Sequence, residues 1–101
     1  MQVDIQIRDS GARIALSGRF DFNSHREFRN GYDALLRDGA LKELELDLAN
    51  VDYLDSSALG MLLLLRERAT AANKSIALAN CRGIVAQVLE VANFNKLFTI
   101  R

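Results

Sequence analysis

The sequence predicts a small α/β domain with a mixed β-sheet, in which parallel crossovers follow an N-terminal hairpin and helices lie mainly on one face. Segments in which apolar and polar residues alternate recur between segments with helical spacing, and strands joined across helices run parallel through right-handed crossovers. The 101 residues suffice for one domain, and no linker or repeat divides residues 1–101. Leu44, Leu46 and Leu48 alternate strictly with acidic residues, whereas a strand covered on both faces would be apolar throughout.

The N-terminal hairpin is predicted from the period-two pattern of residues 3–7, which is typical of a half-buried strand. Its apolar positions are Val3, Ile5 and Ile7. Ser10-Gly11 is a turn signal, and a second strand over residues 12–17 is expected to point Ile14 and Leu16 inward. Residues 18–23 then form a loop.

The first helix is predicted to open at a capping box, with Ser24 as the N-cap and Glu27 three residues later. One apolar stripe follows, and Gly39 ends the helix. The stripe consists of Phe28, Tyr32, Leu35 and Leu36.

The second half of the chain continues the alternation of strand and helix. After the strand at residues 44–48, a helix is predicted from about Ser57 to Ala72. Its early part is apolar all round, which is more than a single buried stripe requires. The remaining predicted elements are a strand at Ser75–Asn80, a helix at Gly83–Ala92 and a final strand at Leu97–Ile100.

Composition excludes several classes of function. The 13 basic residues balance the 13 acidic ones and no basic cluster appears, which argues against nucleic-acid binding. Cys81 is the only cysteine, so no internal disulfide can form, and we expect a buried thiol near a strand end. The chain shows neither a signal peptide nor an apolar run long enough for a membrane, so the sequence predicts a cytoplasmic protein.

The segment Asp55-Ser56-Ser57 is the most informative part of the chain. It stands where the predicted second helix begins and where backbone N–H groups are unpaired. Asp55 or Ser56 is the natural N-cap, but capping explains neither the second serine nor the preceding Asp52. A capping site, an anion site and a phosphorylated serine all fit this geometry.

The helix that follows adds a second observation. Residues 61–65, beginning with Met61, place apolar groups on at least two faces of the helix, and only one face can point at the sheet. An exposed apolar patch beside a hydroxyl that can acquire charge is what a switchable protein–protein interface requires.

Other chemistries fit less well. A hydrolase would need Ser57 and His25 in a triad, but the G-x-S-x-G turn is absent and His25 belongs to another helix. Asp47, Asp52 and Asp55 lack the spacing of a calcium loop, so we predict no metal site. No glycine-rich phosphate loop is present, although weak nucleotide binding near Ser57 stays open. We predict no cofactor and no enzymatic activity.

The chain resembles the STAS domain, and more closely the bacterial anti-sigma factor antagonists. The likeness lies in the strand at 44–51 followed by Asp-Ser-Ser-x-Leu-Gly at 55–60 and a leucine-rich helix. It also lies in Gly-Arg-Phe-Asp at 18–21 and in the closing segment 88–98. This chain departs from the family at Ala58, where the family usually has glycine and where the added methyl is expected to crowd a docked partner.

The resemblance implies a protein-binding switch. In the family, the unphosphorylated form binds a serine kinase that doubles as an anti-sigma factor. The kinase phosphorylates the serine that matches Ser57, and a PP2C-type phosphatase reverses this. The acid matching Asp55 supports that serine, and the acid matching Asp21 lies in the neighbouring loop that meets the kinase. The predicted partner-binding residues are Asp21, Asp55, Ser56, Ser57, Ala58 and Met61.

A second role stays open. STAS modules also act as constitutive subunits of transporters or lipid-transport ATPases, with no phosphorylation required. The second serine favours the switch, because subunits of the other kind often lack a phosphorylatable residue there. Neither the sequence nor the resemblance predicts the oligomeric state.

Overall fold

A computed structural model describes all 101 residues and shows a five-stranded mixed sheet in the order β1-β2-β3-β4-β5. The first two strands form an antiparallel hairpin and all later neighbours are parallel, as predicted. The strands are β1 (Gln2–Arg8), β2 (Gly11–Phe20), β3 (Glu43–Leu54), β4 (Ser75–Ala79) and β5 (Thr99–Ile100).

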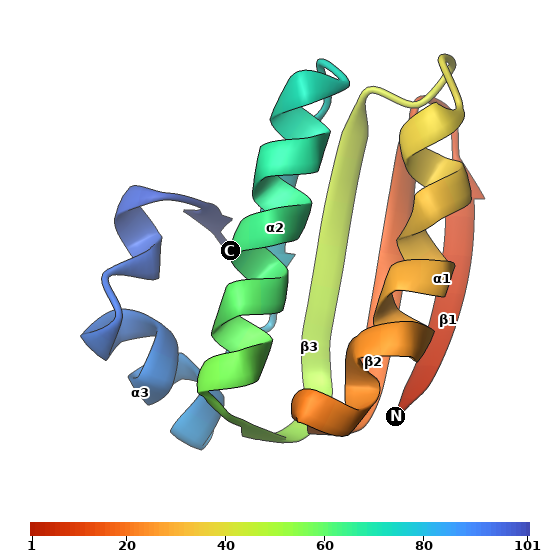
Figure 1. Ribbon diagram of the computed structural model, residues 1–101. Coiled ribbons are helices and arrows are strands. Elements are labelled where there is room, and N and C mark those ends of the chain that lie inside the picture. Colours follow the sequence, from red (N-terminus) through yellow and green to blue (C-terminus); the bar gives the residue numbers. More distant parts are fainter.

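Three α-helices and two single-turn 3-10 helices connect the strands. Helices α1 and α2 lie next to each other in front of the sheet, and α3 lies beyond α2 (Figure 1). Arg68 of α2 forms an ion pair with Asp33 of α1, with 3.7 Å between nitrogen and oxygen. The helices are α1 (His25–Arg37), α2 (Ser56–Ala71) and α3 (Gly83–Val91), and the 3-10 turns are η1 (Phe22–Ser24) and η2 (Phe94–Lys96).

The core fills the space between the helices and one face of the sheet. Its largest contributions come from alternate residues of β2 and β3 and from one side of each helix, and each buried large side chain stabilises the fold by about 1.5–3 kcal/mol. Fully buried members include Ile14, Leu16, Phe28, Leu46, Leu62 and Leu65.

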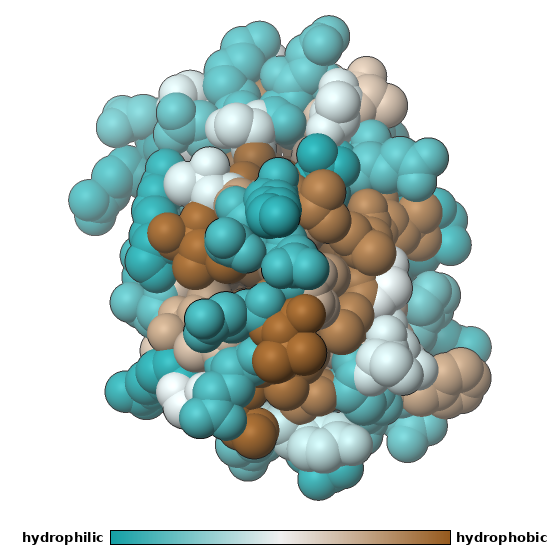
Figure 2. Space-filling view, turned by 90° about the vertical axis from the view of Figure 1, so that its left-hand side faces the viewer, coloured by the Kyte–Doolittle hydropathy of each residue, from teal (hydrophilic) through white to brown (hydrophobic).

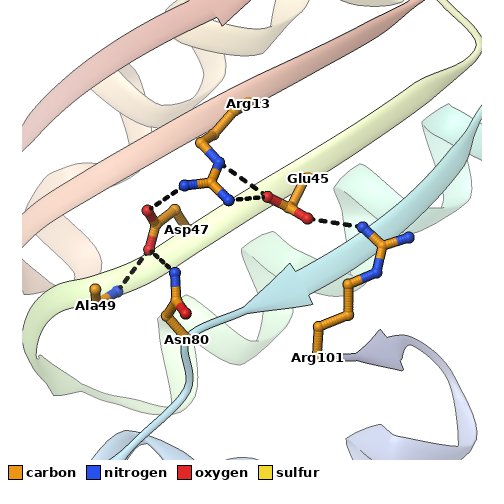
Figure 3. A network of polar contacts seen from close by, with 6 residues as sticks. All are labelled: Arg13, Glu45, Asp47, Ala49, Asn80 and Arg101. Atoms are coloured by element: carbon orange, nitrogen blue, oxygen red, sulfur yellow. Dashed lines mark hydrogen bonds and ion pairs between the residues drawn. The ribbon is translucent and has the colours of Figure 1, made fainter.

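The opposite face of the sheet is not covered by helices and carries a polar network (Figure 3). Arg13 of β2 bonds both Glu45, at 2.6 Å, and Asp47, at 3.1 Å, on β3. Arg101 reaches the other oxygen of Glu45 at 2.7 Å, and the Asn80 amide donates to Asp47 at 3.0 Å. The open face predicted from the alternation of β3 is therefore confirmed.

The prediction that β1 is half-buried is wrong for most of its length. Ile5 is 37% exposed and Ile7 is 58% exposed, while Val3 is half-buried. The reason is position, because β1 is the edge strand, and Val3, which lies opposite Gly31 of α1, is the β1 residue that packs against the core.

The predicted capping box at Ser24 and Glu27 is also wrong. Ser24 makes no side-chain cap to α1 and instead closes a capping box with Asp21 around η1. The Asp21 carboxylate accepts from the Asn23 N–H at 3.0 Å, and the Ser24 hydroxyl accepts from the Asp21 N–H at 3.2 Å. That hydroxyl also donates to the Arg19 carbonyl at 2.9 Å, which holds Ser24 buried.

Several boundaries differ from those predicted. The hairpin turn is Asp9-Ser10, one residue early, and Asp9 has a positive φ of 55°. The sheet pairing continues to the ends of β2 and β3, beyond the predicted residues 17 and 48, through irregularities in the β2–β3 register. The predicted final strand begins only at Thr99, because η2 occupies the segment before it.

Candidate functional site

The site lies where β2 and β3 end side by side. Phe20 pairs with Leu54 at the last position of the two strands, and the Asp55 N–H donates to the Phe20 carbonyl at 3.3 Å. The carboxyl ends of parallel neighbours meet at one edge of a sheet, where binding sites of open α/β folds form. The loops that begin at Asp21 and Asp55 are therefore held next to each other.

Asp55 is the N-cap of α2. Its backbone is extended, with φ −105° and ψ −178°, and its carboxylate accepts from the Ala58 N–H at 2.9 Å. Ser56 is then the first helical residue and Ser57 the second. Of the two N-cap candidates, Asp55 fills the role, so the Ser57 hydroxyl is not needed for capping.

Ser57 opens onto a groove of about 750 Å³ between the start of α1 and the start of α2. Ser57 is half-buried, whereas Ser56 is exposed. The residues that line the groove come from η1 and the first turn of α1 on one side and from α2 on the other: Phe22, Asn23, His25, Arg26, Ser57, Gly60, Met61 and Leu64.

Phe22 is the functional candidate that sequence reasoning missed. Phe22 is 74% exposed, whereas the next two aromatic residues, Phe28 and Tyr32 of α1, are buried. A large exposed aromatic beside a groove is unusual for a surface that touches only water, and aromatic residues dominate binding energy at protein interfaces. The signal in the sequence was an aromatic residue between Asp21 and Asn23 in a polar turn.

Asp21 holds the Phe22 turn in place. Besides capping η1, its carboxylate lies 3.5 Å from the Arg19 guanidinium, which stacks 3.9 Å from the centre of the Tyr53 ring. The predicted contact between Asp21 and a partner stays a prediction, because the structure gives this side chain a structural role as well.

Ala58 and Met61 have different relations to the surface. Ala58 is fully buried, so the expectation that its methyl crowds a docked partner is wrong. Met61 is 8% exposed, belongs to the core and also lines the groove. Met61 therefore connects the packing of α2 with the shape of the groove.

His25 is the first residue of α1, is exposed and lines the same groove as Ser57. The sequence did not predict that these two residues lie in one groove, because they belong to different helices. No group of three or more His, Cys, Asp and Glu side chains is placed to hold a metal ion. None of the helices has the length and apolar character that a bilayer crossing requires.

The other apolar side of α2 faces the C-terminal segment. The Arg66 guanidinium donates to the Leu97 carbonyl at 2.6 Å, and Leu63, one turn earlier, is 39% exposed. Apolar side chains gather on this side of the molecule (Figure 2). Two apolar residues of α3 are largely exposed, Ile84 at 57% and Val91 at 84%.

The pKa values of four groups are shifted: those of Glu45 and Asp47 on the open face of the sheet, that of Cys81, and that of Tyr32 on α1, which burial raises. The hydrogen bond from Arg101, with help from Arg13, lowers the pKa of Glu45. Burial by itself raises the pKa of Asp47, but the Asn80 and backbone hydrogen bonds and nearby arginines outweigh burial and lower it. Burial, reinforced by Asp47, raises the pKa of the half-buried Cys81 thiol.

Almost the whole chain matches one known family. Residues 3–99 match the family described as Mlab, STAS domain. This protein belongs to the STAS domain family. The STAS domain is 47% identical, over 87 residues, to an STAS-domain containing protein of Pseudomonas aeruginosa (strain UCBPP-PA14), and these residues are 86% of this chain and 84% of that protein.

Solved structures share the fold at low identity. The anti-sigma factor antagonist SpoIIAA, in its unphosphorylated form, matches with a TM-score of 0.81 and 17% identity over 99% of this chain and 88% of that chain. SpoIIAA of Bacillus in its phosphorylated form gives a TM-score of 0.75 and 16% identity over 99% and 91%. The murine anion transporter Slc26a9 gives 0.80 and 18% over 94% of this chain but 16% of that chain. The STAS fold is thus shared by an anti-sigma factor antagonist and by an anion transporter.

Proposed function

We propose that this STAS domain is an anti-sigma factor antagonist that acts as a phosphorylation-controlled binding switch and not as an enzyme. Its unphosphorylated form binds a serine kinase that doubles as an anti-sigma factor. The kinase transfers the γ-phosphoryl group of ATP to the Ser57 oxygen, with release of ADP and the hydroxyl proton. A PP2C-type phosphatase hydrolyses the phosphoserine with water, which restores Ser57 and releases inorganic phosphate. The observation that carries this proposal is the placement of Ser57 in a groove beside Phe22, with the helix already capped by Asp55.

The position of Ser57 explains how a modification could act without unfolding the domain. At the second residue of α2, a phosphoryl group meets the positive end of the helix macrodipole. It adds a charge of about −1.5 to −2 beside Asp55 and the loop of Asp21. A partner that docks over Ser57 would then meet a negatively charged rim and would have to desolvate it.

Phe22 supplies the affinity in this proposal. Its ring stands 74% exposed on the wall opposite Ser57, where a partner can bury it. Truncating a central aromatic anchor costs an interface about 2 kcal/mol or more, which is roughly thirtyfold in Kd. We expect Phe22→Ala to weaken kinase binding by that factor while the free energy of unfolding changes little.

The test uses the serine kinase encoded by the same host. Radiolabelled ATP and the kinase should label the wild-type chain and Ser56→Ala but not Ser57→Ala. In calorimetry, Ser57→Ala should bind the kinase as the wild type does, Ser57→Asp should bind at least tenfold more weakly, and the neighbouring Ser56→Asp should change affinity much less. Equal binding by Ser57→Ala and Ser57→Asp would refute the charge switch.

A constitutive subunit of a transporter or lipid-transport ATPase is the second candidate. It is favoured by the family description and by the presence of the fold in Slc26a9. In that role the domain would co-purify with a membrane ATPase whether or not Ser57 is modified. Affinity purification of the wild type and of Ser57→Asp from the host separates the two functions, because only the switch loses its partner.

A further inference from the structure

Strand β1 leaves one complete edge of the sheet unpaired. It spans seven residues at the end of the sheet, with β2 on one side and no element on the other (Figure 1). The opposite edge, β5, has only two residues. Proteins normally protect a long edge strand with proline, charged side chains, a bulge or a covering segment. β1 has no proline, the register irregularities of the sheet fall between β2 and β3, and the two charged residues of β1, Asp4 and Arg8, have opposite signs, so they repel a second strand only in registers that set like charges against each other.

The same strand exposes apolar side chains in a row. Ile5 is 37% exposed and Ile7 is 58% exposed, on the face that the helices cover elsewhere. They pair with Ile14 and Ala12 of β2, which are both buried. The apolar face of the sheet therefore continues past the cover that α1 provides, and a further strand on this edge would bury it.

We propose that β1 pairs antiparallel with β1 of a second copy of this chain, centred on Gln6, so that two five-stranded sheets become one. In this register Asp4 faces Arg8 of the second copy and Arg8 faces Asp4 of that copy. Ile5 faces Ile7 of the second copy on the apolar face. Because the two-fold axis repeats each contact, the strand is complementary to itself in both charge and apolarity.

The backbone allows this register. The two-residue turn joins Arg8 to Gly11, and the pair that flanks such a turn is hydrogen-bonded. Alternation then directs the N–H and C=O groups of Ile5 and Ile7 toward the free edge. Centring on Gln6 places these two outward-directed residues opposite each other, as an antiparallel ladder requires. Centring on Ile5 also satisfies the ladder but sets Asp4 against Gln6, so the charges select the first register.

Sedimentation velocity of the full chain between about 1 µM and 1 mM tests the proposal. An interface of one strand pair lies at the small end of the range for specific complexes, so we expect a weak dimer with a Kd on the order of 10–1,000 µM. Asp4→Arg and Arg8→Asp should each weaken self-association at least about tenfold, because each variant sets two like-charge pairs in place of two ion pairs.

Sedimentation of an equimolar mixture of Asp4→Arg and Arg8→Asp is the decisive experiment. In the mixed dimer every facing pair again joins opposite charges, so an equimolar mixture should associate as tightly as the wild type. Glu90→Arg, an equal change of charge at an exposed position of α3, is the matched control and should leave association unchanged. A chain that stays monomeric at 1 mM overturns the proposal. Single variants that dimerise like the wild type, or a mixture that stays monomeric, overturn it as well.

Discussion

Replacing Lys74 by methionine is expected to lower the free energy of unfolding by about 2–4 kcal/mol. Lys74 lies between α2 and β4 and is only 7% exposed. Its ammonium group donates to the carbonyl oxygens of Asp38 at 2.6 Å and Leu41 at 2.7 Å. These two carbonyls belong to the connection between α1 and β3, so one side chain ties together segments more than thirty residues apart in sequence.

The magnitude follows from what methionine keeps and what it loses. Methionine retains the packing of the aliphatic stem but leaves both carbonyls without their donor. Hydrogen bonds to a charged group contribute about 1.5–3 kcal/mol each, and part of this is offset because the ammonium no longer has to be desolvated. A loss of 2–4 kcal/mol lowers the Tm of a domain of this size by roughly 10–20 °C.

Urea unfolding followed by far-ultraviolet circular dichroism at pH 7 measures the effect. Lys42→Met is the matched control, because Lys42 is exposed in the same part of the fold and its substitution should change stability by less than about 0.5 kcal/mol. If Lys74→Met were no more costly than Lys42→Met, the two carbonyls would not depend on the ammonium, and the reasoning would be refuted.

Three further predictions concern packing and charge. A Cβ at Gly31 would lie 2.7 Å from a Val3 methyl. Gly31→Ala should therefore lower the free energy of unfolding by about 1 kcal/mol in the wild type but raise it by about 0.5–1 kcal/mol in a Val3→Ala background. A double-mutant cycle measured by urea unfolding tests this coupling, and its absence would contradict the close approach. Nothing lies within 4 Å of a Cβ at Gly60. Gly60→Ala should therefore raise the free energy of unfolding by about 0.5–1 kcal/mol, because alanine favours a helix over glycine. A loss of stability in the same assay would show that the space is not open. The lowered pKa values of Glu45 and Asp47 contribute stability that is present above their ordinary values of 4.5 and 3.8 and is lost as the pH falls through the lowered folded-state values. Unfolding of the Glu45→Gln, Asp47→Asn variant should therefore depend less on pH between about 5 and 2 than that of the wild type, and parallel pH profiles would count against the network.

The spacing of apolar residues predicted the order of the elements, because each strand and helix here buries one well-defined side. This spacing could not predict how far a helix packed on the sheet covers the apolar side of each strand. Ile5 and Ile7 alternate with polar residues as Ile14 does, yet they are exposed, whereas Val3 of the same strand lies against α1 and is half-buried. Burial at an edge depends on where a helix from elsewhere in the chain comes to rest, and local sequence carries little information about that.

Capping signals failed for a different reason. Ser24 has the spacing of a capping box both with Glu27 and with Asp21. The box with Asp21 forms, and the Ser24 hydroxyl also donates a hydrogen bond to the Arg19 carbonyl, which holds the side chain on the η1 side. Lys74 likewise has no motif, since its partners are main-chain carbonyls. Asp55 was predictable as a cap because its partner lies three residues away in the same segment.

The predicted site was assembled from two motifs far apart in the sequence, and the pairing of Phe20 with Leu54 explains why they meet. The sequence contained the residues of the α2 wall, Ser57 and Met61, as candidates. It did not identify Phe22 or place His25 across from Ser57, because those positions depend on how η1 turns the chain at the end of β2.

The groove walls have a consequence for how related proteins could diverge. Phe22 lies in η1 and His25 and Arg26 follow it at the start of α1, whereas the turn is anchored by different side chains, chiefly those of Asp21 and Ser24. Duplicated copies in one cell could therefore acquire separate partners by exchanging surface residues, without losing the ability to fold. Met61 is the exception on the facing wall, since it serves the interior and the groove at once. We therefore expect separation between parallel signalling pathways to begin with substitutions at Phe22, His25 and Arg26 and to reach Met61 last.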